Sequence, residues 1–235
     1  MKPDRKFYTL LREASNTQHS AKYARFYKDE DQRSKDDISH SGKCKIIKDL
    51  SASFDKSPTV LDLGCGTGRY FHCLHKVKSL VGLDPSRDML MMAKDPLNQS
   101  QRTAQLVQGS IQELAFKRES FDLIVCIGVL GVVCPADQFT MNHIAEYLKN
   151  NSIFFFTVPE YVPTPQTWKR AMGQIVEPFL FGDLKRYVKI RLRRFAVSEN
   201  ALRKLLPASL ELADLSRWTS GTGRIDLHCV VRKIA

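Results

Sequence analysis

Between residues 58 and 159, short apolar runs alternate with helix-like segments, and this alternation constrains the fold more than any other feature. Strands that are apolar on both faces and separated by helices are typical of a parallel sheet covered by helices on each side. We therefore predict an α/β fold of the three-layer sandwich type. The apolar runs are TVLDL (59–63), SLVGLD (79–84), AQLVQG (104–109), FDLIVCIGV (121–129) and SIFFFTV (152–158).

The two ends of the chain have different patterns. In residues 1–57, which are polar and highly charged, aromatic and aliphatic side chains recur at three-and-four spacing, which predicts amphipathic helices joined by a polar link over 28–43. A helix is predicted over 198–206, where Ser198 stands at the N-cap position. The runs LELADLSRW and RIDLHCVVRKI, joined by TSGTG, predict an antiparallel hairpin. The sheet should therefore have seven strands, mostly parallel, and end in this hairpin.

Charge and cysteine usage narrow the functional classes. The chain of 235 residues holds 36 Lys and Arg against 25 Asp and Glu, a net charge of +11 that favours anionic partners. Its six cysteines form no C-x-x-C pair, which predicts free thiols. His72 and His75 do not have the spacing of a helical zinc pair, so we expect no metal site. The sequence contains neither a membrane-spanning apolar run nor a secretory signal, so we expect a cytoplasmic protein.

The segment VLDLGCGTG (60–68) is the most informative motif. An apolar run enters three alternating glycines, Gly64, Gly66 and Gly68, and we expect a helix to begin near Gly68. Glycines at such a place permit a sharp turn and let a ligand lie against main-chain amides. The spacing is not the G-x-G-x-x-G of nicotinamide-binding folds.

Two aspartates specify the ligand further. Asp62 stands two residues before Gly64, where its negative charge would disfavour a pyrophosphate but suit a cationic ammonium group. Asp84 ends the next apolar run, twenty residues beyond Gly64, and is placed to accept hydrogen bonds from both ribose hydroxyls of a nucleoside. Together these features describe an adenosine ligand that carries an ammonium group and no phosphates.

On these motifs the chain resembles the class I S-adenosylmethionine-dependent methyltransferases. VLDLGCGTG is similar to the family's first motif, GLDPSRDML (82–90) to its second, and FDLIVCIGVL (121–130) to its fourth strand. The resemblance implies a Rossmann-like fold, with an N-terminal helical lid at 1–57 and a methyltransferase domain at 58–235 that contains a substrate-covering helical insertion at 160–196. It also implies S-adenosyl-L-methionine as the cofactor, S-adenosyl-L-homocysteine as its product, and these binding residues: Asp62, Gly64, Cys65, Gly66, Gly68, Asp84, Pro85, Met89, Ser110, Ile111, Cys126 and Ile127.

The sequence departs from the family pattern at Ser110, where the family often carries an acidic residue that contacts the adenine amino group. A hydroxyl can still accept that hydrogen bond, although the contact would be neutral and weaker. The fourth strand ends in CIGVLGVVCP and lacks the [DNS]-P-P-[YF] tetrapeptide of relatives that methylate exocyclic amines of nucleobases or glutamine side chains. Its absence argues against those substrates.

No catalytic residue stands out, because methyl transfer needs a base only when the acceptor must lose a proton. Tyr23 and Tyr27, one helical turn apart, could shield the methyl group, and packing residues are the alternative reading for both. His19 beside them is the candidate base. The candidates for substrate binding, each also readable as an ordinary packing or surface residue, are Glu160, Tyr161, Trp168 and Arg191.

We expect the protein to transfer a methyl group to O or N of a small molecule, anionic molecules included, by in-line displacement. The basic segment KRYVKIRLRRF (185–195) leaves a second hypothesis open, an RNA methyltransferase acting on tRNA or rRNA. The same segment could equally be a solvated helix face or part of a pocket for an anionic small molecule. A third hypothesis is a protein that binds S-adenosylmethionine without catalysis.

Overall fold

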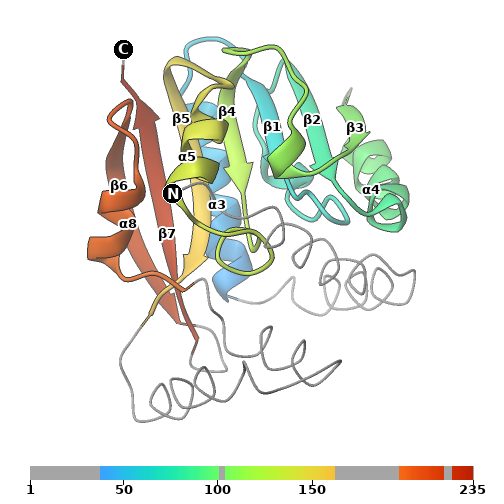
Figure 1. Ribbon diagram of the computed structural model, residues 1–235. Coiled ribbons are helices and arrows are strands. Elements are labelled where there is room, and N and C mark those ends of the chain that lie inside the picture. The colour runs from blue at the N-terminus through green and yellow to red at the C-terminus, as the bar shows by residue number, and fades with distance from the viewer. Residues whose placement is uncertain (1–37, 101–103, 162–195, 220–223, 235) are drawn as a thin grey trace.

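The computed structural model describes residues 38–100, 104–161, 196–219 and 224–234 (Figure 1). A seven-stranded sheet with the order β3-β2-β1-β4-β5-β7-β6 forms its centre. The strands are β1 Thr59–Leu63, β2 Ser79–Asp84, β3 Ala104–Gln108, β4 Phe121–Cys126, β5 Leu148–Pro159, β6 Leu210–Thr219 and β7 Ile225–Lys233.

Strands β1 to β5 run parallel, whereas β7 lies antiparallel between β5 and β6. The order of the parallel strands reverses between β1 and β4, and in open α/β sheets ligands collect beyond the carboxyl ends of the strands at such a switch point. The structure therefore confirms the predicted fold class, including the terminal hairpin of β6 and β7. It also places the end of the glycine motif at the switch point.

Helices cover both faces of the sheet (Figure 1). On one face, α3 (Ile38–Ala52), the 3-10 helix η2 (Phe71–Cys73) and α4 (Arg87–Ser100) share a core with alternate strand residues. On the other face, η3 (Ile111–Glu113), α5 (Gln138–Ala145) and α8 (Glu199–Leu205) do the same.

Strand β5 shows why its sequence is apolar throughout. Phe154 and Phe156 point into the core that α5 completes, whereas Ile153 and Phe155 point into the core beneath α3. The three phenylalanines are fully buried, and each contributes on the order of 1.5–3 kcal/mol by leaving water. The run SIFFFTV is therefore a central strand packed on both sides.

Polar caps fix where the helices on the α5 face begin. The Asp137 Oδ1 atom accepts a hydrogen bond of 2.8 Å from the Thr140 amide at the start of α5. The Ser198 hydroxyl oxygen accepts one of 3.2 Å from the Ala201 amide at the start of α8, which confirms the predicted N-cap. Each cap satisfies an amide that has no partner within its helix and typically contributes about 1 kcal/mol.

Two local predictions were wrong. The segment after the glycine motif forms turns and the short η2 rather than an α-helix, because Gly68 has φ +75° and Leu74 is extended, so neither end of the segment continues a helical path. The helix α3 begins at Ile38, inside the predicted polar link over 28–43, and it buries Ile47 against the sheet.

The cysteine prediction was wrong for one pair. Cys44 on α3 and Cys73 on η2 form a disulfide, because α3 packs over η2 and brings their Cα atoms to 5.0 Å across a sequence separation of 29. Four other cysteines are free, as predicted, and all four are buried: Cys65, Cys126, Cys134 and Cys229.

Within the described ranges, no helix has the length and apolar character needed to cross a membrane.

Candidate functional site

The glycine motif forms a tight turn that connects the end of β1 to the end of β2. The Gly64 and Cys65 amides both donate to the Leu83 carbonyl oxygen, at 2.7 and 3.0 Å. Gly64 and Gly66 have φ values of +72° and +54°, in the region that favours glycine. A Cβ atom on Gly64 would overlap the Val129 side chain, whereas one on Gly66 would have nothing within 4 Å. Gly64 is thus required for packing, and Gly66 borders open space.

Asp84 at the end of β2 is fixed by two main-chain amides. Its Oδ2 atom accepts a hydrogen bond of 3.0 Å from the Gly66 amide, and its Oδ1 atom accepts one of 2.8 Å from the Ser86 amide. The side chain is 8% exposed. The fold therefore brings together two predicted ligand-binding residues, Gly66 and Asp84, and holds the carboxylate in one orientation.

Asp62 is the second buried carboxyl of the site. It lies level with Gly82 of β2 and Val125 of β4 and is 5% exposed. Burial and then the negative charge of Asp84 raise the pKa of Asp62 to about 7. A positively charged ligand group would offset both effects and favour the ionised carboxylate. The site therefore fits the predicted ammonium group.

The loop after β2 forms one side of the site. The Met89 amide donates to the Ser86 hydroxyl oxygen at 3.3 Å, and Met89 is buried at the start of α4. The Pro85 carbonyl oxygen accepts from the Gln108 side-chain amide at 3.2 Å. The loop that follows Asp84 therefore holds both predicted residues, Pro85 and Met89.

The loop after β3 contacts the end of β2. The Gly109 amide donates to the Asp84 main-chain carbonyl oxygen at 3.2 Å, which places the following Ser110 and Ile111 near Asp84. Ser110 has an extended backbone directly before η3, and Ile111 is buried. Both predicted residues therefore lie in the loop that contacts the end of β2.

At the end of β4 the two predicted residues contribute differently. Cys126 is fully buried in the core on the α5 side, whereas Ile127 is half-buried and packs on the α3 side. Burial raises the pKa of the Cys126 thiol well above its usual range, and the same cause raises that of Cys65. Neither thiol is therefore suited to act as a base or nucleophile near neutral pH.

Two residues of this site were missed from the sequence. The Gly128 amide donates to the Thr157 hydroxyl oxygen at 2.9 Å, which links the ends of β4 and β5, and a Cβ atom on Gly128 would have nothing within 4 Å. Gly128 has φ +72°. The sequence did contain two signals for these residues. Thr157 is a polar residue near the end of an otherwise apolar run, and Gly128 follows shortly after the run that forms β4.

The predicted substrate-binding residues are only partly described. The Glu160 carboxylate forms an ion pair of 3.0 Å with Arg217, which also contacts Glu199 at 2.6 Å. Tyr161 is 49% exposed, and its amide donates to the Val197 carbonyl oxygen at 3.0 Å. The remaining candidates lie outside the described residues, as does the basic segment: His19, Tyr23, Tyr27, Trp168, Arg191 and 185–195.

Comparisons with known proteins agree with this geometry. Residues 60–151 match the family model of a methyltransferase domain. An uncharacterized protein of Methanocaldococcus jannaschii is 29% identical over 161 residues, which are 62% of this chain and 59% of that protein. A ubiquinone biosynthesis O-methyltransferase of Coxiella burnetii is 30% identical over 104 residues, 44% of each chain. The match thus spans about three-fifths of the first relative and less than half of the second.

Solved structures share the fold. Magnesium protoporphyrin IX methyltransferase from Synechocystis, crystallised with S-adenosylhomocysteine, superposes with a TM-score of 0.61 at 15% identity and covers 83% of each chain. This likeness confirms the predicted Rossmann-like fold, and the family model matches a methyltransferase domain over residues 60–151.

Proposed function

We propose that the chain is an S-adenosylmethionine-dependent methyltransferase acting on O or N of a small molecule, and the match of residues 60–151 to the family model of a methyltransferase domain supports this proposal. The observation that carries the proposal is the pair of buried carboxyls, Asp62 and Asp84, on either side of a glycine turn with open space at Gly66.

The residues of the site fit each part of S-adenosylmethionine, which supplies a methyl group made electrophilic by its bond to a sulfonium sulfur. Asp62 would pair with the ammonium group of the amino-acid tail, and Asp84 would accept hydrogen bonds from the ribose hydroxyls. The glycine turn lets the ligand approach the main chain. Four further residues would hold the adenine ring and its edge: Pro85, Met89, Ser110 and Ile111.

The protein would accelerate the transfer mainly by positioning, because holding both reactants in line contributes several kcal/mol, roughly 7–11 in the best cases. A lone pair on the acceptor's O or N forms the new bond to carbon while the carbon–sulfur bond breaks and its electron pair stays on sulfur. An acceptor proton passes to solvent or to a base. The raised pKa values of the Cys65 and Cys126 thiols exclude both groups as that base.

Two observations support a small acceptor over a nucleic acid. The end of β4 lacks the tetrapeptide associated with nucleobase amines. The relative from Coxiella burnetii and the structural neighbour from Synechocystis are named for small-molecule substrates. The net charge of +11 favours an anionic acceptor of either class, because long-range attraction raises the rate of encounter with any anion.

A transfer assay with methyl-tritiated S-adenosylmethionine tests the proposal. One reaction would contain a panel of small phenols, amines and carboxylates, and a parallel reaction would contain unmodified tRNA and rRNA transcripts. We expect label in the small-molecule fraction, lost in Asp84→Asn and retained in Asp55→Asn, an exposed aspartate away from the site. Label in RNA alone would instead establish an RNA methyltransferase. Cofactor binding without transfer to either panel would favour a non-catalytic protein.

A further inference from the structure

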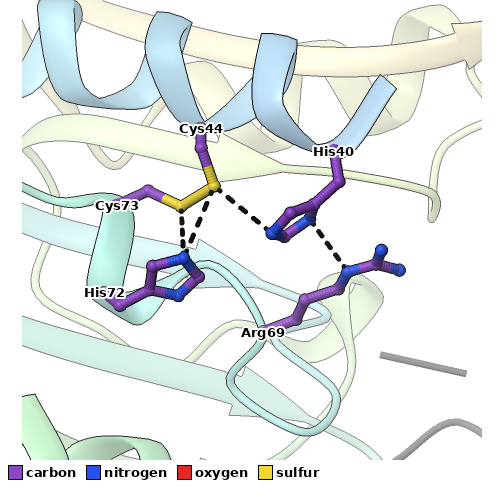
Figure 2. Close-up of a disulfide and its surroundings, with 5 residues drawn as sticks. All are labelled: His40, Cys44, Arg69, His72 and Cys73. Carbon is purple, nitrogen blue, oxygen red and sulfur yellow. Dashed lines mark hydrogen bonds between the residues drawn. A yellow bond between two sulfur atoms is a disulfide. The ribbon is translucent and has the colours of Figure 1, made fainter. Parts of the chain in front are cut away.

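Four potential metal ligands meet where α3 packs over the segment that follows the glycine turn (Figure 2). His40 and Cys44 lie one helical turn apart on α3 and project from the same side of it. His72 and Cys73 are adjacent on η2. Figure 2 shows both imidazole rings turned toward the two sulfur atoms. Ligand atoms from His40, Cys44 and His72 all lie within 4.8 Å of one another.

We propose that this cluster is a zinc site, formed by His40, Cys44, His72 and Cys73 when the disulfide is reduced. Two thiolates and two imidazoles are a common ligand set for structural Zn²⁺. The proposal concerns residues outside the methyl-transfer site and stands independently of the proposed function.

The distances between the ligand atoms support tetrahedral coordination. With Zn–S and Zn–N bonds of about 2.3 and 2.1 Å, a regular tetrahedron places nitrogen and sulfur about 3.6 Å apart. The Cys44 Sγ atom lies 3.6 Å from His40 Nε2 and 3.7 Å from His72 Nε2. The Cys73 Sγ atom lies 3.4 Å from His72 Nε2. The main rearrangement needed is therefore the separation of the two sulfurs once their bond is broken.

One side of the cluster is buried and the other is exposed to solvent, so an ion could enter from the exposed side. His40 and Cys73 are buried, at 5% and 6% exposure, and hold the inner side. Cys44 is half-buried and His72 is exposed, so the outer side opens to solvent. From the sequence we expected no metal site, because the ligands come from two segments that lie 28 residues apart.

Metal binding and the disulfide exclude each other chemically. A dithiol reductant supplies two electrons and two protons, which convert the disulfide to two thiols, and the reductant itself becomes a disulfide. Zn²⁺ then displaces both thiol protons to solvent and takes two sulfur and two nitrogen ligands. A small-molecule disulfide can take two electrons from the two thiolates and two protons from solvent, so that it becomes two thiols while the Cys44–Cys73 disulfide re-forms and the ion is released. The link between α3 and η2 is thus kept in both states.

Arg69 affects how His40 can bind the metal. Its Nε–H group donates to His40 Nδ1 at 3.1 Å, so the neutral His40 ring carries its proton on Nε2. Coordination through Nε2 moves that proton to Nδ1, where the Arg69 donor would oppose it. Zinc binding must therefore break this hydrogen bond. Arg69→Gln offers a carbonyl acceptor for Nδ1–H and should tighten metal binding several-fold.

Titration of the full, metal-free chain with Co²⁺ tests the site, after reduction with a phosphine. We expect one Co²⁺ per chain, with visible bands of tetrahedral cobalt, a thiolate-to-cobalt charge-transfer band in the near ultraviolet, and displacement by Zn²⁺. The oxidised chain should show no charge-transfer band. A fully reduced wild type without that band would overturn the proposal.

Matched variants assign the ligands. Cys73→Ser should lose half of the thiolate charge-transfer intensity or the entire site. His72→Gln, at an exposed position where folding is not at risk, should weaken Co²⁺ binding at least tenfold, whereas His75→Gln, in the same segment, should not. An unchanged affinity in His72→Gln would contradict the site. An unchanged affinity in Arg69→Gln would remove His40 from the ligand set and contradict four-ligand coordination.

Discussion

The Gly66 amide donates a hydrogen bond of 3.0 Å to the Oδ2 atom of Asp84, and this contact ties the glycine turn after β1 to the end of β2. The carboxylate is thereby oriented before any ligand arrives. Pre-orientation lowers the free-energy cost of ordering the site on binding. It also makes Asp84 the residue whose substitution should affect cofactor binding most directly.

Asp84→Asn should lower the affinity for S-adenosylhomocysteine about tenfold or more, because hydrogen bonds to a charged group contribute roughly 1.5–3 kcal/mol. Titration calorimetry measures the loss. The control is Asp55→Asn, which makes the same chemical change at an exposed position. Equal affinities in wild type and Asp84→Asn would show that the ribose does not bind there.

Gly66 and Gly64 should respond differently to alanine. In Gly66→Ala the new methyl group has nothing within 4 Å, so stability should fall only by the backbone cost of a positive φ, roughly 1–2 kcal/mol. Cofactor affinity should fall much further, since we propose that the ligand lies in that space.

In Gly64→Ala the methyl group overlaps Val129, so folding itself should suffer. Denaturant unfolding and calorimetry on both variants separate the two effects. Full cofactor affinity in a folded Gly66→Ala protein would argue against this pocket.

Asp62 should make cofactor affinity depend on pH. Its pKa is about 7 in the folded chain without ligand, and an ammonium partner favours the ionised form. Below pH 7, binding should therefore release a proton, and affinity should rise with pH until the carboxyl is ionised. Calorimetry in buffers of different ionisation enthalpy measures the proton. Asp62→Asn should bind more weakly and lose this proton release, and a wild type that releases none at pH 6 would contradict the assignment.

The same carboxyl should affect folding stability with the opposite trend. Its ordinary pKa is 3.8, so between about pH 4 and 7 the folded chain holds a proton that the unfolded chain has lost. Asp62 therefore makes its whole contribution to the free energy of unfolding below about pH 4, and this contribution is lost as the pH rises toward 7. Three other groups interact electrostatically with Asp62, so the variants used in this experiment must leave them unchanged: Asp84, Cys65 and Cys126. The slope should disappear in Asp62→Asn, and persistence of the full slope there would assign it to another group.

Gly42 on α3 should tolerate no side chain, although alanine normally favours a helix by about 1 kcal/mol. A Cβ atom at Gly42 would overlap the Trp218 ring of β6. Gly42→Ala should therefore lower the free energy of unfolding in wild type and raise it when Trp218→Leu is also present. A double-mutant cycle by urea unfolding measures this coupling. Additive effects would show that α3 does not dock against Trp218.

The sequence predicted the sheet well because its strands are apolar on both faces and end at recognisable turns. TVLDL and SLVGLD became β1 and β2 with the predicted bounds, and Asp62 and Asp84 came to the same edge of the sheet. Features that depend on packing between distant segments were not predictable in this way. The Cys44–Cys73 pairing and the Gly128–Thr157 contact both arise only once α3 and β5 are in place.

The missing helix after Gly68 has a similar cause. GRYFHCLHKV has helical spacing, but Phe71 is fully buried in the core beneath α3, and Gly68 is held at a positive φ beside it. A Cβ atom on Gly68 would come within 2.6 Å of the Phe71 ring. Tertiary packing therefore overrides the local preference, as it often does for short segments.

A crystal structure of the chain soaked with S-adenosylhomocysteine tests the central claim most directly. The account predicts density over the glycine turn, with the ribose hydroxyls at Asp84 and the amino group of the amino-acid tail at Asp62. Density for the ligand elsewhere, or none in this crevice at saturating concentration, would contradict it.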